Sequence, residues 1–205
     1  MSEHRETADA VWAELVRRHD EHVATHGYDG TVADHNPAAA VLACSDARVP
    51  PSVLFGQDPG SLFVVRIAGS SATAGAVASL TFAVEHLGCG LVVVLGHTNC
   101  GAVRAALDDS PDPVLAPVLA PILAPIDEML AACQSCDGDL DAAVAANVAH
   151  NLRRLRRNRG PLGNAIAEGR AVLRGAVHDL ATGRLIEITE EGPAGESPAL
   201  SVPIP

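Results

Sequence analysis

Short apolar runs alternate with longer amphipathic stretches along the chain, and this pattern predicts strands that alternate with helices. Continuous apolar runs predict strands buried on both faces at residues 38–44, 62–67 and 91–95. Helical spacing or capping residues predict helices at residues 9–22, 74–87, 101–108 and 139–157, with a shorter helix after Pro161. Residues 171–177 and 184–188 predict two further strands joined by a turn. Such alternation is typical of an α/β fold with a mainly parallel sheet.

Two of the predicted helices carry clear end signals. Thr73 is predicted to cap the helix at 74–87, because its hydroxyl can accept a hydrogen bond from the first turn. Gly88 is predicted to end that helix, since glycine adopts the left-handed conformation that closes many helices. Asp139 is predicted to cap the long helix that follows, whose arginine-rich C-terminal end suits the helix dipole.

A proline recurs at every fourth residue from Pro113 to Pro125. Proline lacks a backbone N–H and its ring clashes with a preceding carbonyl, so a regular helix is disfavoured here. We therefore predict an irregular or extended insert at residues 111–125, with a helix resuming near Ile126. The insert lies within an α/β domain (37–189), which we expect to follow an N-terminal helical arm (1–36) and to precede a flexible C-terminal tail (190–205).

Composition and charge narrow the classes of protein to which the chain can belong. The chain has 205 residues, which suits one domain of ordinary size, and 48% of them are hydrophobic. Its formal net charge of -11 argues against a surface that binds nucleic acid. We recognise no signal peptide, and the continuous apolar runs are too short to cross a bilayer. We therefore expect a cytoplasmic protein with no membrane and no nucleic-acid partner, whose five cysteines are thiols or metal ligands.

Two segments rich in reactive side chains directly follow predicted strands. Residues 44–50 read Cys-Ser-Asp-Ala-Arg-Val-Pro, and residues 96–101 read Gly-His-Thr-Asn-Cys-Gly. Ligand crevices of open α/β sheets form at the carboxyl ends of the strands. If the first and third strands are neighbours, Cys44 and His97 end side by side, with Cys100 at the start of the next helix. Two thiolates and one imidazole suit Zn²⁺ and leave its fourth position open, as catalysis requires.

The alternative is that these cysteines are only small buried residues. That interpretation suits any single cysteine at a strand end. It suits less well a group of three possible ligands that lies beside the charged Asp46 and Arg48. A closed structural zinc site would need a fourth cysteine or histidine, which neither segment supplies. We interpret Cys133 and Cys136, a C-x-x-C pair, as thiols without function rather than a redox pair or half of a second zinc site. We interpret Cys89 as a residue that only packs in the core.

The two segments resemble the C-S-D-S-R-V-P and G-H-x-x-C-G-A-V signatures of the β-class carbonic anhydrases. Between them, Pro-Gly-Ser-Leu-Phe-Val-Val-Arg-Ile-Ala-Gly at 59–69 is similar to the family's P-G-D-L-F-V-x-R-N-A-G. The resemblance runs from about Val41 to Val103, weakens through the proline-rich segment and returns at residues 175–183. It implies the β-carbonic anhydrase fold, with a central sheet in the order 2-1-3-4, a C-terminal edge strand and flanking helices.

The resemblance also implies an activity, the reversible hydration of carbon dioxide to bicarbonate and a proton. Zn²⁺ would be held by Cys44, His97 and Cys100. Zinc bound by two thiolates carries no net charge and acidifies its water less than a tris-histidine site does. Another group must therefore help to bring the pKa of the bound water near neutrality. Asp46 would accept a hydrogen bond from zinc-bound hydroxide and orient it toward carbon dioxide. That role requires an ionised Asp46, which the adjacent Arg48 favours.

Three further residues are carried over as substrate-binding candidates. Gln57 lies where some relatives place a glutamine that helps hold bicarbonate, with Asp58 a rival for that position. Gly101 follows the second zinc cysteine and is expected to line the same pocket. Phe82 stands where several relatives have an active-site tyrosine, so the contribution of that hydroxyl is absent.

The sequence departs from the family pattern at positions that bear on the pocket and its regulation. Ile67 and Ser70 replace asparagines that are common in the family. Some bacterial relatives have a non-catalytic bicarbonate pocket built on a tryptophan and a tyrosine, where this chain has Val41 and, by our alignment, His178. Arg66 matches the third member of that pocket. We therefore predict that bicarbonate inhibition through such a pocket is absent or altered.

The family also implies a partner, a second copy of this chain. Its active sites lie at a dimer interface onto which the N-terminal helices reach, so a homodimer or a higher even oligomer is expected. Two rival functions stay open. One is hydrolysis of carbonyl sulfide or carbon disulfide, which some proteins of the same fold perform. The other is a non-catalytic zinc-binding protein, which the presence of both Asp46 and Arg48 disfavours.

Overall fold

The computed structural model describes residues 2–27, 30, 32, 35–108, 112–132 and 138–193. The chain divides into two compact units, Met1–Asp34 and His35–Pro205. The first unit contains one helix, α1 (Ser2–His26), which is longer than the helix predicted at 9–22. Ion pairs between Glu14 and the guanidinium groups of Arg17 and Arg18 lie along its exposed surface. The second unit carries the sheet and the other helices.

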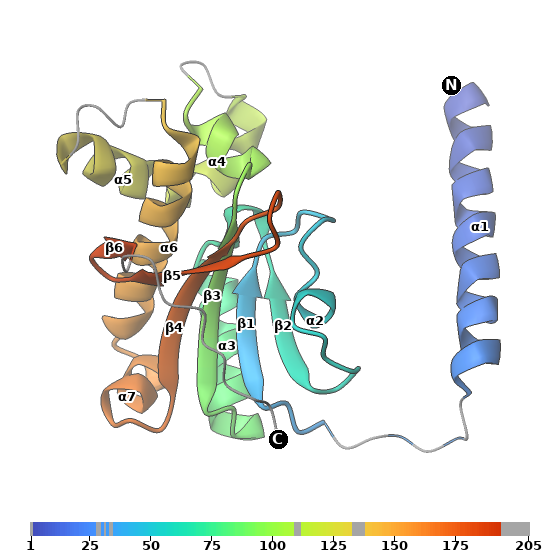
Figure 1. The fold of residues 1–205 in the computed structure, drawn as a ribbon, viewed down its shortest axis with the longest axis horizontal. Coiled ribbons are helices and arrows are strands. Elements are labelled where there is room, and N and C mark those ends of the chain that lie inside the picture. Colours follow the sequence, from blue (N-terminus) through green and yellow to red (C-terminus); the bar gives the residue numbers. More distant parts are fainter. Residues whose placement is uncertain are drawn as a thin grey trace. The chain divides into compact units, whose positions relative to one another are not determined.

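A six-stranded sheet forms the centre of the second unit (Figure 1). Its order is β2-β1-β3-β4-β5-β6, and the first four strands run parallel while β5 and β6 are antiparallel. The strands are β1 (Ala39–Ala43), β2 (Leu62–Arg66), β3 (Leu91–His97), β4 (Val172–His178), β5 (Leu185–Thr189) and β6 (Gly192–Pro193). The predicted α/β class, the order 2-1-3-4 and the added C-terminal edge strand are confirmed.

The helices of this unit begin and end close to the residues that signal them. They are α2 (Pro51–Leu54), α3 (Ala74–Leu87), α4 (Gly101–Ala106), α5 (Ala116–Ala132), α6 (Leu140–Arg156) and α7 (Pro161–Ala167). The Thr73 hydroxyl accepts from the Ala76 amide at 3.4 Å, and Gly88 ends α3 in the left-handed conformation (φ 71°). The Asp139 carboxylate accepts from the second and third amides of α6. All three predicted end signals are thus confirmed.

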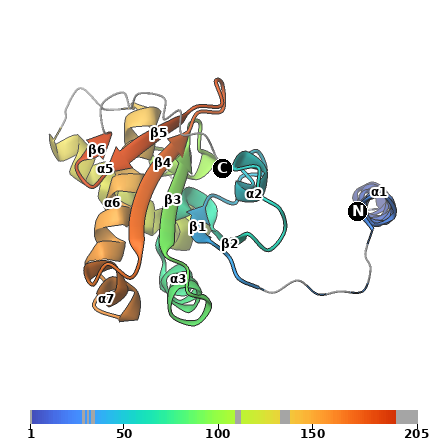
Figure 2. The same cartoon turned by 60° about the horizontal axis from the view of Figure 1, so that its bottom comes forward.

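The alternation of side chains along β1 divides the core between the two faces of the sheet. Ala40 and Leu42 pack with helices α3 to α7 in the main core. Val41 and Ala43 point the other way and, with Leu95, form a smaller core against the residues of α2. Because β1 is covered on both faces and paired at both edges, a five-residue run with no polar side chain is what its position requires. Figure 2 shows α2 on the opposite side of the sheet from α3.

The prediction of an irregular insert at 111–125 was wrong over the part that the structure describes. Residues 113–115 form a short 3-10 turn that leads directly into α5, which contains Pro121 and Pro125. Prolines four residues apart lie on one side of a helix, so the lost hydrogen bonds fall along one line. The helix buries Leu119, Ile122 and Ile126, together with Pro125 itself. Burial of these residues outweighs the intrinsic preference of proline against helices.

By length and composition alone, the stretch from Pro113 to Ala132 could also cross a membrane. Core helices of other proteins pass the same test, and α5 contacts α4 and α6 here.

Two other predictions fall partly or wholly outside the described residues. Cys133 and Cys136 lie outside them, and so does the predicted tail from residue 194 onward. The first residues of that tail instead belong to the β5–β6 hairpin.

The register of α5 can be tested with two neighbouring residues. Ile122 is fully buried, whereas Leu123 is 37% exposed. We expect Ile122→Ala to lower the free energy of unfolding by about 2–5 kcal/mol, because it leaves a cavity in the core. Leu123→Ala should cost less than about 1 kcal/mol. Urea unfolding of the two variants measures both values. Equal losses would contradict the position of the helix, in which Ile122 faces the core and Leu123 faces outward.

Candidate metal centre

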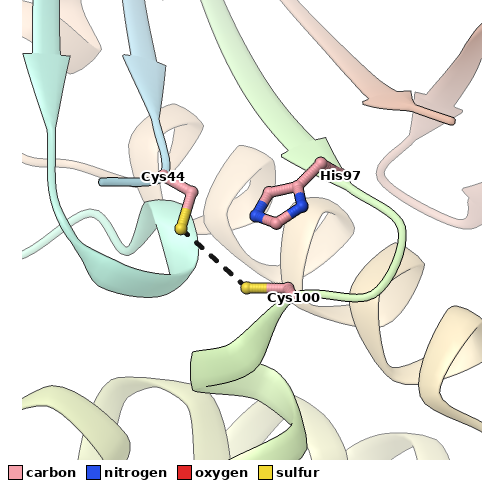
Figure 3. A group of neighbouring side chains, drawn as sticks. All are labelled: Cys44, His97 and Cys100. Atoms are coloured by element: carbon pink, nitrogen blue, oxygen red, sulfur yellow. Dashed lines mark hydrogen bonds between the residues drawn. The ribbon is translucent and has the colours of Figure 1, made fainter. Parts of the chain in front are cut away.

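The parallel pairing of β1 with β3 brings the two sequence motifs together. Ala43 pairs with Leu95, so Cys44 directly follows β1 at the edge of the sheet where β3 ends at His97. A short turn then returns the chain to Cys100, which stands at the N-cap of α4. Asn99 makes that turn in the left-handed conformation (φ 58°), which asparagine tolerates better than most residues. Figure 3 shows the three side chains converging from these three elements.

The distances within this group suit a single metal ion. The ligand atoms of Cys44, His97 and Cys100 all lie within 4.8 Å of one another, and all three residues are buried. The two sulfur atoms are 3.9 Å apart. A tetrahedral zinc with bonds of about 2.3 Å to sulfur places two thiolates about 3.8 Å apart. The structure therefore brings together the three predicted ligands at the spacing that zinc requires.

The hydrogen bonding of His97 leaves one ring nitrogen for a metal. Its Nδ1 lies 2.9 Å from the carbonyl oxygen of Thr98, which can only accept, so Nδ1 carries the proton and donates. Nε2 is then the unprotonated nitrogen, and it is buried with no nitrogen or oxygen partner among the described residues. A buried polar atom without a partner is costly. Its position beside two sulfurs fits a soft cation as the missing partner.

The two sulfurs differ in their affinity for protons. The pKa of the Cys44 thiol falls to about 4, chiefly because Cys100 donates to it, with further help from the backbone amides of Asp46 and Gly69, against the opposing effect of burial. The pKa of Cys100 is raised, first by the Cys44 sulfur and then by burial. Two sulfurs at this distance cannot both ionise unless a cation compensates their charge. The donor set is therefore built for a divalent ion.

The imidazole of His97 responds to the same neighbours. Burial lowers its pKa, but the Cys44 sulfur, the Thr98 carbonyl and the Asp46 carboxylate together outweigh burial, so the pKa of His97 is raised overall. Each of these neighbours is negative or accepts hydrogen bonds, so the group as a whole favours positive charge at its centre.

Asp46 and Arg48 form a two-pronged ion pair beside the group. The Arg48 Nε and one terminal nitrogen donate to the two Asp46 oxygens at 2.9 and 2.6 Å, and the Arg48 amide donates to the same carboxylate at 2.9 Å. These contacts hold the pKa of Asp46 well below its usual range, so the carboxylate is ionised. Its Oδ2 lies 3.9 Å from His97 Nε2. A fixed negative acceptor thus borders the position that a metal would take.

Arg66 has a role that sequence reasoning missed. It was considered only as a member of a bicarbonate pocket, but its guanidinium donates to the backbone carbonyls of Cys44 and Asp46, the first at 2.9 Å. It therefore holds the segment that carries both a ligand and the acceptor. The other two positions of the supposed pocket lie elsewhere in the sheet. Val41 is buried in the smaller core, and His178 ends β4, paired in register with His97.

The three substrate-binding candidates lie in less enclosed places. Gln57 follows α2, and its side-chain amide donates to the Phe55 carbonyl at 3.1 Å. Phe82 is 47% exposed on α3, where its ring packs against Phe63 and His86. Gly101 is the first residue of α4, with open space where a Cβ would stand. Their roles in binding substrate stay predictions.

The two asparagines that the family has and this chain lacks are replaced by residues with structural contacts. Ile67 donates its amide to the Ala43 carbonyl at 3.0 Å, which extends the pairing of β2 with β1. Ser70 is buried, and its hydroxyl donates to the Leu95 carbonyl at 2.8 Å. Both residues belong to the loop that follows β2 and passes next to the Cys-His-Cys group.

Comparison with known proteins identifies the family. The family model described as carbonic anhydrase matches residues 39–185, which include all three candidate ligands. The chain belongs to the carbonic anhydrase family. A carbonic anhydrase of Pseudomonas aeruginosa is 36% identical over 160 residues, covering 73% of this chain and 72% of that protein. A carbonic anhydrase of Mycolicibacterium smegmatis is 32% identical over 163 residues, covering 78% and 79%.

Solved structures place the chain in the β class of carbonic anhydrases. A β-carbonic anhydrase of Coccomyxa, solved with acetazolamide, superposes with a TM-score of 0.73 at 25% identity, covering 87% of this chain and 84% of the other. One from Aspergillus fumigatus gives a TM-score of 0.68 at 28% identity, covering 91% and 89%. A tetrameric β-carbonic anhydrase of Sordaria macrospora gives 0.66 at 26% identity, covering 88% and 93%. The predicted family is confirmed.

The metal assignment can be tested against a second buried cysteine. We expect Cys44→Ala to lose bound zinc, because two remaining ligands hold zinc poorly. Cys89→Ala is the matched control, since Cys89 is also buried but donates to the Pro37 carbonyl away from the group. Metal analysis after dialysis against a weak chelator gives the zinc content of each variant. Stoichiometric zinc in Cys44→Ala would refute the assignment.

Proposed function

We propose that this carbonic anhydrase uses zinc at Cys44, His97 and Cys100 to hydrate carbon dioxide reversibly to bicarbonate and a proton. The observation that carries the proposal is the unpartnered Nε2 of His97, which faces two sulfurs beside a carboxylate held in place by arginine. A structural zinc site needs only four ligands. The ionised carboxylate at 3.9 Å from that nitrogen adds a proton acceptor, which a purely structural site would not use.

Zinc bound at these residues would supply a Lewis acid that makes water nucleophilic near neutral pH. The residues of the chain then determine where that water points. Asp46 can accept a hydrogen bond from the attacking water and so fix which lone pair faces carbon dioxide. Arg48 keeps the carboxylate ionised and bonds to both of its oxygens, which leaves it a lone pair for water. The thiolates of Cys44 and Cys100 would cancel the charge of a bound zinc ion, so the site would depend more on Asp46 than a site with neutral ligands.

The rival substrates are carbonyl sulfide and carbon disulfide, linear molecules that resemble carbon dioxide. Stopped-flow assays of the zinc-loaded chain with each of the three substrates separate these activities. The proposal requires carbon dioxide to be turned over fastest. A chain that binds zinc tightly and turns over none of them would instead be a zinc-binding protein.

We further propose that the chain works as a homodimer or a higher even oligomer. Each unit of the chain exposes apolar surface by itself. On α1, Val11, Trp12 and Leu15 are more than half exposed and follow helical spacing. In the second unit, Phe82 and Val53 are 47% and 74% exposed. Apolar surface of this kind commonly marks a protein interface, and the relative from Sordaria macrospora is tetrameric.

The role of Asp46 can be separated from metal binding. We expect Asp46→Asn to retain zinc and to lose carbon dioxide hydration by about 100-fold or more, because a neutral amide is a far weaker acceptor. Asp127→Asn, at an exposed position of α5, is the matched control and should keep full activity. Stopped-flow hydration assays and metal analysis on the same samples supply both values. Full activity in Asp46→Asn would exclude the acceptor role.

Sedimentation velocity tests the proposed assembly. At micromolar concentration the chain should sediment as a dimer or tetramer, and Trp12→Glu should shift it toward smaller species by placing charge in the apolar stripe of α1. Glu21→Gln, on the same helix, is a control that should leave the assembly unchanged. A fully active wild-type monomer would contradict the proposal.

A further inference from the structure

Two buried asparagines of α6 contact the loop beside the metal centre. Asn147 and Asn151 are 3% and 1% exposed, and they lie four residues apart on a helix face that otherwise buries aliphatic side chains. An unpaired buried amide is costly, whereas leucine would fill such a place at no such cost. Their presence therefore calls for specific partners.

Those partners are backbone groups of the loop at residues 67–72. The Asn147 Nδ2 donates to the Gly69 carbonyl at 2.7 Å, and the Asn151 Oδ1 accepts from the Ala72 amide at 2.7 Å. Asn151 also donates to the carbonyl and the side-chain oxygen of Asn147, which links the two amides. A carbonyl can only accept and a backbone amide can only donate, so these contacts fix the orientation of both side chains.

The loop has an unusual backbone that requires such support. Gly69 and Ser70 both adopt positive φ, 72° and 54°. For serine this conformation costs energy and persists only where the surroundings hold it. The Ser70 hydroxyl bonds to β3, and α5 closes over the glycine. A Cβ on Gly69 would lie 2.4 Å from the Cδ1 of Ile122. The loop is thus held from β3, α5 and α6 together.

The same loop is bonded to the strands that lead to two candidate zinc ligands. The Ile67 amide donates to the carbonyl of Ala43, which precedes Cys44, and the Ser70 hydroxyl donates to the carbonyl of Leu95 on β3, which ends at His97. Groups that surround the ligands of a metal orient them, and their loss weakens metal binding. A shift of the loop away from α6 would therefore disturb the positions from which Cys44 and His97 reach the metal.

We propose that Asn147 and Asn151 are positioning residues of the metal centre, which hold the 67–72 loop against the ends of the strands that lead to Cys44 and His97. The inference rests on the proposed function only in that it takes Cys44 and His97 as zinc ligands. It assigns to α6 a contribution to zinc binding, although α6 supplies no ligand.

Zinc affinity is the first test. Asn147→Leu and Asn151→Leu keep the side-chain size but cannot bond to the loop, and each should weaken zinc binding by about tenfold or more in competition with a chelator. Asn147→Ser, whose shorter side chain cannot reach Gly69, provides a second variant if leucine does not fit. Leu155→Ala is the matched control, because Leu155 is fully buried about one turn of α6 beyond Asn151 and its loss destabilises the fold without removing a bond to the loop.

Cobalt substitution gives a second readout that a general loss of stability would not move. The thiolate-to-cobalt charge-transfer absorption should change in the asparagine variants and stay unchanged in Leu155→Ala. Wild-type zinc affinity and an unaltered cobalt spectrum in folded asparagine variants would overturn the inference. So would an equal loss of zinc affinity in Leu155→Ala. If the wild type binds zinc but does not hydrate carbon dioxide, the proposed function fails while these comparisons still decide the role of the asparagines.

Discussion

The parallel pairing of β1 with β3 is the constraint on which the rest of the site depends. The two strands are far apart in sequence, and their register, with Ala43 opposite Leu95, determines where Cys44 and His97 emerge. A slip of one residue would turn the β1 side chains to the opposite faces, so that Cys44 would leave the side of the sheet on which Ala40 and Leu42 pack. Both faces of β1 are buried, so a slip would exchange its side chains between the two cores, where residues of another size and shape would no longer pack.

Close packing of α6 against the sheet extends this constraint to the loop beside the metal group. Gly96 on β3 and Gly175 on β4 are neighbours of that helix. A Cβ on Gly96 would lie 2.6 Å from Val148, and one on Gly175 would lie 2.6 Å from Leu152. Both strands therefore lack a side chain where α6 comes near. That close approach also sets the distance from which Asn147 and Asn151 reach the loop, so two glycines that supply no ligand help to define the site.

Much of this arrangement follows from sequence because its signals are local. The apolar runs at 39–43 and 91–95, the Thr73 cap and the glycine after α3 each act within a few residues, and each was predicted. The proline-rich segment was not, because the burial of Ile122 depends on helices distant in sequence, and local preference alone pointed the other way. The asparagines of α6 were missed for the same reason. They lie about 50 residues beyond the second motif, and only the folded chain shows that they contact the loop.

The charges around the Cys-His-Cys group support the proposed role of Asp46 as an acceptor beside that group rather than a ligand within it. Two thiolates and a carboxylate would bring three negative charges within a few ångströms, more than one divalent ion neutralises. The Arg48 guanidinium neutralises the third charge, and Arg48 makes three hydrogen bonds to Asp46 from its side chain and backbone. Arg66 holds the carbonyls on both sides of Ser45, which keeps Asp46 from approaching the sulfurs by a movement of the backbone. An aspartate held in this way keeps a lone pair available for water, so under the proposed function the two arginines would contribute to the chemistry along with the ligands.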